Sequence, residues 1–307
     1  MKNIIFLVAI ASLFLTSSCN KVEQPIDQDF LDKSIYPGTW EEYESNEWPT
    51  FTDNTNLDRN VLIEDFTGHK CIYCPAAAAL AEQLEEDNYG RIFVAAIHTG
   101  PDGIGSFQET HTGLYEHEFY NPEGLEIGTF LGKNTAGSNF VANPWGTISR
   151  IPVNNQNTHH PNTWTSLVNN TLASNSLKIN LQGKVNYYEE SKGFYLHTEI
   201  EKKVEISNDI AQVVYLIEDS IVKPQAFPSG VDSINYVHHH VMRGCIDGKA
   251  LGKTVSDSYK NTNGKYYLDY SYRIPSQYNP ENLHLLVYVY DKVTREIYQV
   301  IKVKIVE

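Results

Sequence analysis

Hydrophobic and polar positions between residues 61 and 98 follow the pattern of a strand, a helix and a second strand. Residues 61–66 are an apolar-rich run, and residues 76–84 combine alanines with leucines one turn apart. Gly90 favours an end of the helix, because glycine is a poor helix former. Residues 91–98 are nearly continuously apolar, as in a parallel strand that is covered on both faces. The pattern predicts a β-α-β unit.

Residues 99–142 are a long connection with eight glycines, and we expect part of it to be helical near Leu114 to Phe119. Residues 145–150 then predict a strand, and residues 164–172 predict a closing helix. Because a single strand precedes that helix, we expect the closing hairpin of the unit to be truncated.

From residue 177 onward, alternation with a period of 2 replaces these patterns and predicts a sheet. Apolar or alternating runs occupy residues 177–185, 194–200, 211–217, 266–272, 283–291 and 297–305. With the histidine-rich stretch around residues 238–240 they make about seven strands, which favours an immunoglobulin-like β-sandwich. The expected fold is therefore an α/β domain, residues 57–174, followed by an all-β immunoglobulin-like sandwich domain, residues 175–307.

Residues 1–18 have the pattern of an export signal. Lys2 precedes the apolar residues 4–15, and small residues lead from there to Cys19. Small residues directly before a cysteine resemble a bacterial lipobox, in which that cysteine becomes the lipidated first residue of the mature chain. We therefore expect a lipid anchor on Cys19 and a location at the outer membrane of a bacterial envelope. The alternative is an ordinary secretory signal with a cysteine near its cleavage site.

Residues 19–56 show no sustained period of 2 or 3.6, which predicts a spacer between the anchor and the globular body. Trp40 and Trp48 are the spacer residues that we expect to pack on that body. After residue 18, no apolar run approaches the roughly 20 residues that span a bilayer, so we expect membrane attachment through the lipid anchor.

The charge of the chain excludes one class of partner. The chain has 24 Lys and Arg residues against 38 Asp and Glu residues, which gives a formal net charge of −14. Such a chain is repelled by the phosphate backbone of nucleic acids. We therefore expect no nucleic-acid partner.

Cys71 and Cys74 form a CxxC motif at the start of the predicted helix. The first sulfur lies where free backbone N–H groups and the helix dipole stabilise a thiolate, and the second is within disulfide reach one turn along. This arrangement predicts a redox-active dithiol with Cys71 as the nucleophile and Cys74 as the resolving cysteine. A structural disulfide and half of a zinc site have the same spacing, but zinc needs two more ligands, and the other cysteines are Cys19 and Cys245. Export of the chain favours the redox interpretation.

The motif and its surroundings resemble the thioredoxin superfamily and, more narrowly, the outer-membrane protein 28 family of bacterial lipoproteins. The resemblance spans most of the mature chain and rests on residues 63–75, 96–100 and 238–244. It implies that residues 57–174 form a thioredoxin-like domain. The sequence departs from the usual thioredoxin motif at Lys70, Ile72 and Tyr73, which are positions that tune the redox potential and the choice of partner. The direction of exchange therefore stays open.

The resemblance implies two further site residues. Asp65 stands in an Asp-Phe pair six residues before the first cysteine, where thioredoxins carry a buried aspartate that helps to move the proton of the resolving cysteine. Its neighbour Glu64 is the alternative for the carboxylate that faces inward. Pro144 matches the cis-proline beside the dithiol, where a backbone edge receives a peptide substrate, and Pro152 is the alternative position.

Four more residues are candidates with open roles. His98 ends the second predicted strand, where open α/β sheets carry their sites, so it is either a polar contact of the dithiol or a structural histidine. His238 and His240 share one face of a predicted strand, which suits either a metal site or a packed or solvated strand. Cys245 is either a buried thiol or a disulfide partner for Cys71.

The sequence thus predicts a lipid-anchored envelope protein whose dithiol exchanges disulfides with protein partners. The alternative is a non-catalytic surface binding or adhesion protein that uses the fold as a scaffold. We assign no cofactor and no metal site. The oligomeric state and the ligand of the β-sandwich stay open.

Overall fold

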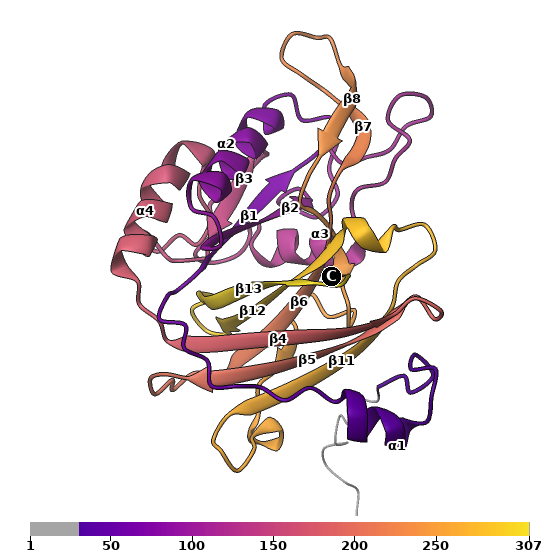
Figure 1. Cartoon of the computed structure of the whole chain (residues 1–307). Coiled ribbons are helices and arrows are strands. Elements are labelled where there is room, and N and C mark those ends of the chain that lie inside the picture. The colour runs from indigo at the N-terminus through magenta and orange to yellow at the C-terminus, as the bar shows by residue number, and fades with distance from the viewer. Residues whose placement is uncertain (1–30, 307) are drawn as a thin grey trace, which may run out of the picture. The chain divides into compact units, whose positions relative to one another are not determined.

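A mixed β-sheet runs through the protein and contains strands from both halves of the chain (Figure 1). The computed structural model describes residues 31–306, so the predicted signal peptide, Cys19 and the first part of the predicted spacer lie outside the described residues. The strands are β1 (Val61–Thr67), β2 (Ile92–His98), β3 (Trp145–Ile148), β4 (Ile179–Tyr188), β5 (Gly193–Lys202), β6 (Ile210–Glu218), β7 (Ile221–Gln225), β8 (Ser233–His238), β9 (Val241–Cys245), β10 (Lys253–Thr254), β11 (Tyr266–Arg273), β12 (Leu283–Asp291) and β13 (Ile297–Lys304). The large sheet has the order β13-β12-β6-β9-β2-β1-β3, with β10 paired to β6, and two smaller sheets have the orders β11-β5-β4 and β7-β8.

Helices make up a small part of the described residues. They are α1 (Trp40–Glu42), α2 (Cys74–Asp87), α3 (Pro122–Phe130) and α4 (Trp164–Ser174), with a π-helical turn at Tyr43–Glu47 and 3-10 turns at Pro161–Thr163, Asp257–Tyr259 and Pro280–Asn282. The protein is therefore a mixed α/β protein that consists mostly of β-sheet. The predicted β-α-β unit is confirmed as β1, α2 and β2, and the predicted closing helix is confirmed as α4.

The helix of the long connection does not lie where we expected it. No helix forms near Leu114 to Phe119, and α3 instead begins at Pro122, where the Asn121 side chain accepts a hydrogen bond from the Gly124 N–H group. Proline at the first helical position favours such a start. A side chain at Gly128 would overlap Thr99, so this glycine lets α3 pack closely on β2. Gly124 and Gly128 stand where close packing leaves little room for a side chain. The helix therefore lacks the apolar pattern by which it could have been predicted.

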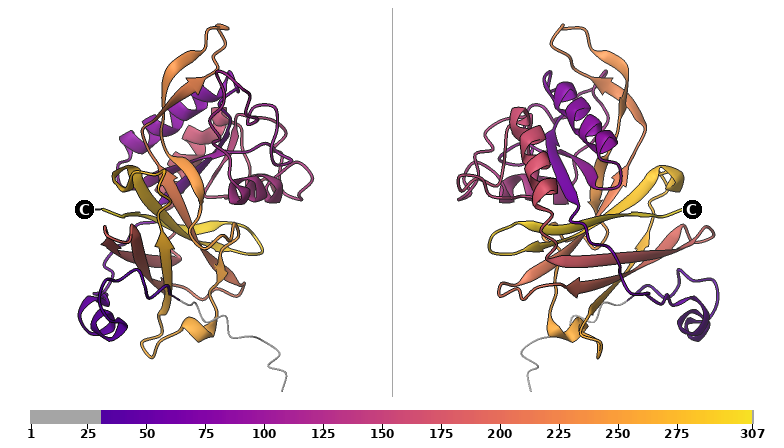
Figure 2. Two further views of the ribbon diagram at one scale, coloured as in Figure 1. Left: turned by 90° about the vertical axis from the view of Figure 1, so that its right-hand side faces the viewer. Right: turned by 60° about the vertical axis from the view of Figure 1, so that its left-hand side comes forward.

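Strand β1 lies between β2 and β3 at one end of the large sheet. It pairs with β2 in parallel and with β3 in antiparallel orientation, and it is buried along its whole length. Because side chains of a strand alternate, Val61 and Ile63 pack on the face that α2 and α4 cover, whereas Leu62 and Phe66 pack on the opposite face together with α3 (Figure 2).

The second half of the chain is not a separate sandwich. Strands β6, β12 and β13 belong to the large sheet, and one of its faces packs on the β11-β5-β4 sheet through a core that includes Leu196, Leu268 and Leu285. Strand β9 pairs with β6 and also with β2, so the sheet continues across the boundary that we expected between residues 174 and 175. The expected change from helix-containing to all-β structure occurs there, but the strands on both sides share one sheet.

Residues 31–56 pack on the β11-β5-β4 sheet and are not a free spacer. Trp40 and Trp48 pack with Tyr43, and the Tyr43 hydroxyl lies 2.6 Å from His197 Nε2 of β5. Farther along, side chains of β4 donate hydrogen bonds to backbone carbonyl groups of the segment, in the pairs Asn186–Glu47, Lys184–Thr50 and Gln182–Thr52. The expectation that both tryptophans pack on the globular body is confirmed.

A hairpin formed by β7 and β8 leaves the large sheet after β6 and returns to it at β9. It stands beside α2 in the views of Figures 1 and 2. The hairpin thereby brings residues 221–238 to the start of α2, far from them in the sequence.

Candidate functional site

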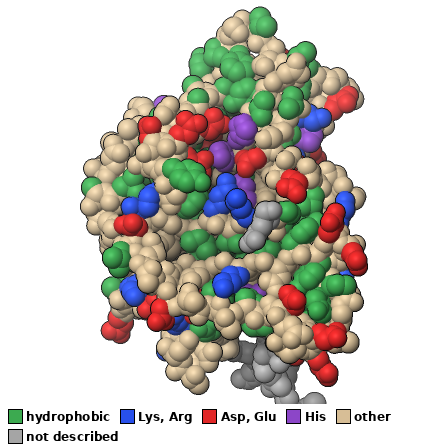
Figure 3. All heavy atoms as spheres, viewed as in Figure 1, with side chains coloured by type: hydrophobic (Ala, Val, Ile, Leu, Met, Phe, Trp, Pro, Cys, Tyr) green, Lys and Arg blue, Asp and Glu red, His purple; other side chains and the backbone are tan. Residues whose placement is uncertain are grey.

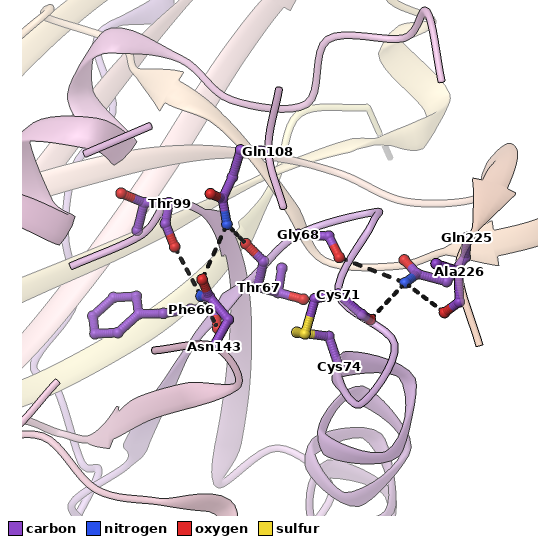
Figure 4. Close-up of a disulfide and its surroundings, with 10 residues drawn as sticks. All are labelled: Phe66, Thr67, Gly68, Cys71, Cys74, Thr99, Gln108, Asn143, Gln225 and Ala226. Atoms are coloured by element: carbon purple, nitrogen blue, oxygen red, sulfur yellow. Dashed lines mark hydrogen bonds between the residues drawn. A yellow bond between two sulfur atoms is a disulfide. The ribbon is translucent and has the colours of Figure 1, made fainter. Parts of the chain in front are cut away.

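The two cysteines of the CxxC motif form a disulfide at the start of α2. Cys71 lies in the turn after β1, Cys74 is the first residue of the helix, and their Cα atoms are 5.4 Å apart (Figure 4). The Cys71 N–H group donates to the carbonyl oxygen of Gly68, and the Cys74 N–H group donates to that of Cys71. Both cysteines are only 1% exposed.

Side chains of two loops fix the strand ends beside the disulfide. Asn143 Nδ2 donates to the carbonyl oxygens of Phe66 and Thr99, at 2.8 and 2.9 Å, and so ties β1 to β2. Gln108 Nε2 donates to the Thr67 carbonyl oxygen at 2.7 Å (Figure 4). A Cβ atom at Gly68 would lie 2.6 Å from the carbonyl oxygen of Phe107, so the turn needs glycine there.

Pro144 follows Asn143 at the start of β3, and the peptide bond between them is cis, as the resemblance implied. An apolar groove of about 500 Å³ lies beside this bond. Its lining comes from the start of α2 and from the segments around β3 and the 3-10 turn Pro161–Thr163, and includes Tyr73, Ala76, Leu80 and Trp145. Tyr73 lies between the two cysteines and is 63% exposed. The groove therefore adjoins the CxxC motif.

Asp65 faces the other side of the disulfide. It is 1% exposed, and its Oδ1 atom has no hydrogen-bond partner within residues 31–306. Burial, together with the nearby carboxylate of Glu82, raises the pKa of Asp65 to about 8. Asp65 and Cys74 line one small cavity of about 30 Å³. Asp65 therefore lies beside Cys74, and its role in moving the proton of that cysteine stays a prediction.

Glu64, the alternative carboxylate, is equally buried but points to the opposite face of β1. Arg150 donates to both of its carboxylate oxygens, at 2.6 and 2.8 Å, and the Tyr215 hydroxyl donates at 2.8 Å. Burial by itself would raise the pKa of Glu64, but the charge and hydrogen bonds of Arg150 outweigh it and lower that pKa. Glu64 is therefore an ionised structural residue that joins β1 to the second half of the sheet.

Histidines gather beside the cavity. His98 ends β2 and stacks on Phe119 with ring centroids 4.5 Å apart, and His238 of β8 packs on the same ring at 4.4 Å. Both histidines line the cavity with Asp65 and Cys74, and His98 Nδ1 and His238 Nε2 have no hydrogen-bond partner in the described part of the chain. Burial lowers the pKa of His238 to about 4 and that of His98 well below its ordinary value. His98 therefore lies near the dithiol, as the sequence suggested.

His238 and His240 do not lie on one face of a single strand, which was the prediction. His240 begins its return to the sheet with φ of 57°, and its Nε2 atom contacts Glu85 at 3.2 Å while its N–H group donates to Asp219. The reversal at this residue breaks the strand between β8 and β9, so the two side chains do not share one strand face, although both line the cavity beside Cys74. Across residues 31–306 no group of three or more His, Cys, Asp and Glu side chains is arranged to hold a metal ion.

Cys245 is a free thiol, and it does not pair with Cys71. It is 7% exposed on β9, and burial raises its pKa well above the ordinary value. Its side chain belongs to the core on the far side of β1 from the disulfide. The interpretation of Cys245 as a buried apolar thiol is the one that agrees with the structure.

Residues of the β7–β8 hairpin, which the sequence did not point to, reach the motif. Gln225 Nε2 donates to the carbonyl oxygens of Cys71, at 3.1 Å, and Gly68, at 3.5 Å (Figure 4). The Ala226 N–H group donates to the carbonyl oxygen of His69 at 2.9 Å. Tyr236 of the same hairpin lines the cavity. Nothing in the local sequence marks these residues, because they contact the dithiol loop from about 150 positions away.

The sequence matches the model of one protein family. The model of a family described as outer membrane protein Omp28 matches residues 136–307, which is more than half of the chain. The match begins after Cys71 and Cys74, so it carries no information on the dithiol. No curated protein matches the chain.

Solved structures that match this chain include two from Porphyromonas gingivalis. HBP35 of Porphyromonas gingivalis has 14% sequence identity, with 82% of this chain and 76% of that chain covered, and a TM-score of 0.61. At this identity the likeness shows a shared fold. A domain of the outer membrane lipoprotein Omp28 from Porphyromonas gingivalis has 23% identity, with 42% of this chain and 88% of that chain covered, and a TM-score of 0.28. No helix within residues 31–306 is long and apolar enough to cross a membrane.

Proposed function

Since the chain belongs to the Omp28 family of outer-membrane proteins, we propose that it is a lipid-anchored envelope protein whose Cys71–Cys74 pair exchanges disulfides with protein partners. The family is one of outer-membrane lipoproteins, which agrees with the location that residues 1–19 predict. The lipid on Cys19 is part of the proposal.

The observation that carries the proposal is the disulfide at the first turn of α2, with an acid on one side and an apolar groove on the other. A partner thiolate attacks Cys71 Sγ, the bond to Cys74 breaks, and the electron pair stays on Cys74 Sγ, which takes up a proton. A second partner thiolate then attacks the mixed disulfide and releases Cys71. The partner leaves oxidised and the protein leaves reduced, and the reverse sequence oxidises the protein.

Asp65 supports this chemistry as the proton donor and acceptor for Cys74. Both groups line the same cavity, and a carboxyl with a pKa of about 8 is half ionised close to the pH range in which thiols titrate. Such a group exchanges protons with a thiol at a small free-energy cost. We propose this role together with a thioredoxin-like arrangement of β1, α2, β2, β3 and α4.

The apolar groove supports a peptide as the substrate. It runs along the cis bond before Pro144 and past Tyr73, and β3 is the last strand of the sheet order. An extended segment of a partner placed there gains apolar contacts for its side chains and hydrogen bonds to backbone groups of β3 other than those of Gly146, which already pair with His159.

A second candidate function rests on a different observation. Both cysteines are 1% exposed, which also suits a disulfide that serves as a structural clip. The protein would then be a non-catalytic binding or adhesion protein that uses the fold as a scaffold. The two functions differ in how easily the disulfide is reduced.

The reduction potential of the Cys71–Cys74 pair separates these functions. The protein is equilibrated with glutathione and dithiothreitol buffers, and alkylated thiols are counted by mass, with Cys245 as the internal reference. A potential of roughly −120 to −270 mV, the range of known exchange proteins, supports exchange and gives its direction. A value below about −300 mV, or wild-type and Cys71→Ser cells with the same envelope thiol state, favours the clip.

A further inference from the structure

The cavity beside Cys74 is lined by elements from four parts of the chain. Its lining includes Asp65 from β1, Glu82 from α2, His98 from β2 and both Tyr236 and His238 from the β7–β8 hairpin. A cavity of about 30 Å³ is large enough for a water molecule, which needs polar partners. Figure 3 shows histidine and acidic side chains on the face between α2 and the hairpin, where Glu82 and His239 are partly exposed.

Cys74 needs a route for its proton. When the disulfide is reduced, Cys74 Sγ takes up a proton, and when the disulfide forms it gives one up. Cys74 is 1% exposed and Asp65 is 1% exposed, so neither exchanges protons directly with the solvent. Any proton that Asp65 gives to Cys74 must be replaced through the cavity.

The histidines of the cavity have the chemistry for this replacement. A neutral imidazole has one nitrogen that accepts and one that donates, so it takes a proton on one side and gives one on the other. His98 Nδ1 and His238 Nε2 are buried without a hydrogen-bond partner among the described residues, and so is Asp65 Oδ1. With His240 Nδ1, which also lacks a hydrogen-bond partner among these residues, four such polar atoms belong to side chains that line one small cavity.

We propose that His98 and His238 are positioning residues that connect Asp65 and Cys74 to the solvent as a proton path through the cavity. The path serves the exchange chemistry of the proposed function, on which this inference rests. The hairpin supplies its outer wall, because His238 reaches the cavity only while β7 and β8 lie against α2. Hydrogen bonds from Gln225 and Ala226 to the dithiol loop hold the hairpin there.

The charged and titratable groups around the path come from every element packed on it. They are Asp65 of β1, Glu82 and Glu85 of α2, His98 of β2, Tyr236 and His238 of the hairpin, and His239, His240 and Asp219 at its base, with His69, His117 and Arg243 around Phe119. Burial keeps both path histidines neutral at pH 7, which is the form that accepts and donates.

The test compares His98→Gln and His238→Gln with His117→Gln in the full-length protein. Glutamine keeps polar atoms but does not carry protons at neutral pH. His117 is the matched control, because it packs on the same Phe119 ring at 4.6 Å and burial lowers its pKa to about 4 as well, but it does not line the cavity. Reduction by dithiothreitol and reoxidation by oxidised dithiothreitol are followed by stopped flow from about pH 5.5 to about pH 9, in water and in heavy water, after correction for the thiolate fraction of the reagent.

A proton path raises the rates of reduction and reoxidation of the disulfide by the same factor, so it leaves the reduction potential unchanged. We expect each path variant to lower the rates of reduction and reoxidation by about tenfold or more, with a changed pH profile and an unchanged reduction potential. His117→Gln is expected to keep the wild-type rates. Wild-type rates in both path variants, a shifted potential in either, or an equal loss of rate in His117→Gln overturns the proposal.

A second pair of variants covers the case in which a path histidine is needed for folding. Gln225→Glu places a carboxylate against the Cys71 carbonyl oxygen and releases the hairpin, and Gln83→Glu is its control on the exposed side of α2. Loss of rate in Gln225→Glu alone supports the path, and equal rates in both variants contradict it. Because dithiothreitol is the partner throughout, these results stand even if a potential below about −300 mV rules out exchange with proteins.

Discussion

Glu64 and Asp65 are consecutive residues of β1, and their buried carboxyl groups face opposite sides of the sheet. Glu64 accepts hydrogen bonds from Arg150 and Tyr215, whereas Asp65 Oδ1 has no partner among residues 31–306. Arg150 accordingly lowers the pKa of Glu64 against the effect of burial, while burial raises the pKa of Asp65 to about 8. One step along the strand therefore separates a structural carboxylate from a carboxyl group that holds its proton.

The raised pKa of Asp65 makes stability depend on pH. Above about pH 4 the unfolded chain releases this proton while the folded protein keeps it up to about pH 8, so the contribution of Asp65 to stability falls as the pH rises through that range. The slope is at most about 1.4 kcal/mol per pH unit. We expect Asp65→Asn to stabilise the protein, and more at pH 8 than at pH 5. Urea unfolding of both proteins with the disulfide intact measures the difference, and a difference that is constant with pH contradicts the assignment.

The ion pair between Glu64 and Arg150 leads to a prediction about stability. Arg150→Met leaves a buried carboxylate without its partner, which costs about 3–5 kcal/mol of unfolding free energy. The double variant Glu64→Gln/Arg150→Met removes that charge, so we expect it to be more stable than Arg150→Met alone. Denaturant titration of both variants and of Glu64→Gln completes the cycle. If the changes in unfolding free energy of the two single variants add up to that of the double variant, the two side chains do not interact in solution.

The sequence predicted the local part of the site and not the part that is assembled over a distance. Residues 61 to 98 carry their own pattern, so the β-α-β unit and the position of Cys74 at a helix start followed from that pattern, whereas the choice of Asp65 came from the resemblance. The cis bond before Pro144 came from the resemblance, because a pattern of residue types does not distinguish cis from trans proline.

The sequence did not predict the β7–β8 hairpin or the sheet that both halves of the chain share. Gln225 reaches the Cys71 carbonyl group across 154 positions, and β9 pairs with β2 across a similar interval. The apolar runs of β6, β12 and β13 fit strands of a separate sandwich as well as strands of a continued sheet, because residue types do not show which strands pair. Only the pairing of β9 with two strands distinguishes them.

Buried histidines lead to a prediction for the acid side of the pH range. Burial lowers the pKa of His238 to about 4, so between about pH 6.5 and pH 4 the unfolded chain binds a proton that the folded protein does not, and stability is lost as the pH falls. We expect His238→Gln to lose less stability than the wild type between pH 7 and pH 5. Thermal unfolding at both pH values measures this, with His111→Gln, an exposed residue, as the control. Equal losses in all three proteins would contradict the prediction.

Cys245 is expected to be unreactive in the folded protein. It is 7% exposed, and burial raises the pKa of its thiol, so few thiolates are available to an alkylating reagent. Iodoacetamide should modify it at least about a hundredfold more slowly in the native protein than in urea, as measured by mass spectrometry. Fast native labelling, or a disulfide between Cys245 and Cys71, would show that the core around β9 opens.

The apolar groove beside the CxxC motif separates recognition of a partner from the chemistry of the disulfide. Ala76 and Ala79 are both exposed on α2, but Ala76 lines the groove and Ala79 does not. Glutamine at either position adds length and polarity without charge, so both variants should keep the helix and the reduction potential. In Ala76→Gln the added side chain occupies the groove, and we expect kcat/KM with an unfolded cysteine-containing protein to fall by about tenfold, mainly through KM, because uniform binding is lost. Reduction by dithiothreitol, which does not need the groove, should be unchanged in both variants. If Ala76→Gln and Ala79→Gln transfer electrons to the protein substrate equally well, the partner does not lie in this groove.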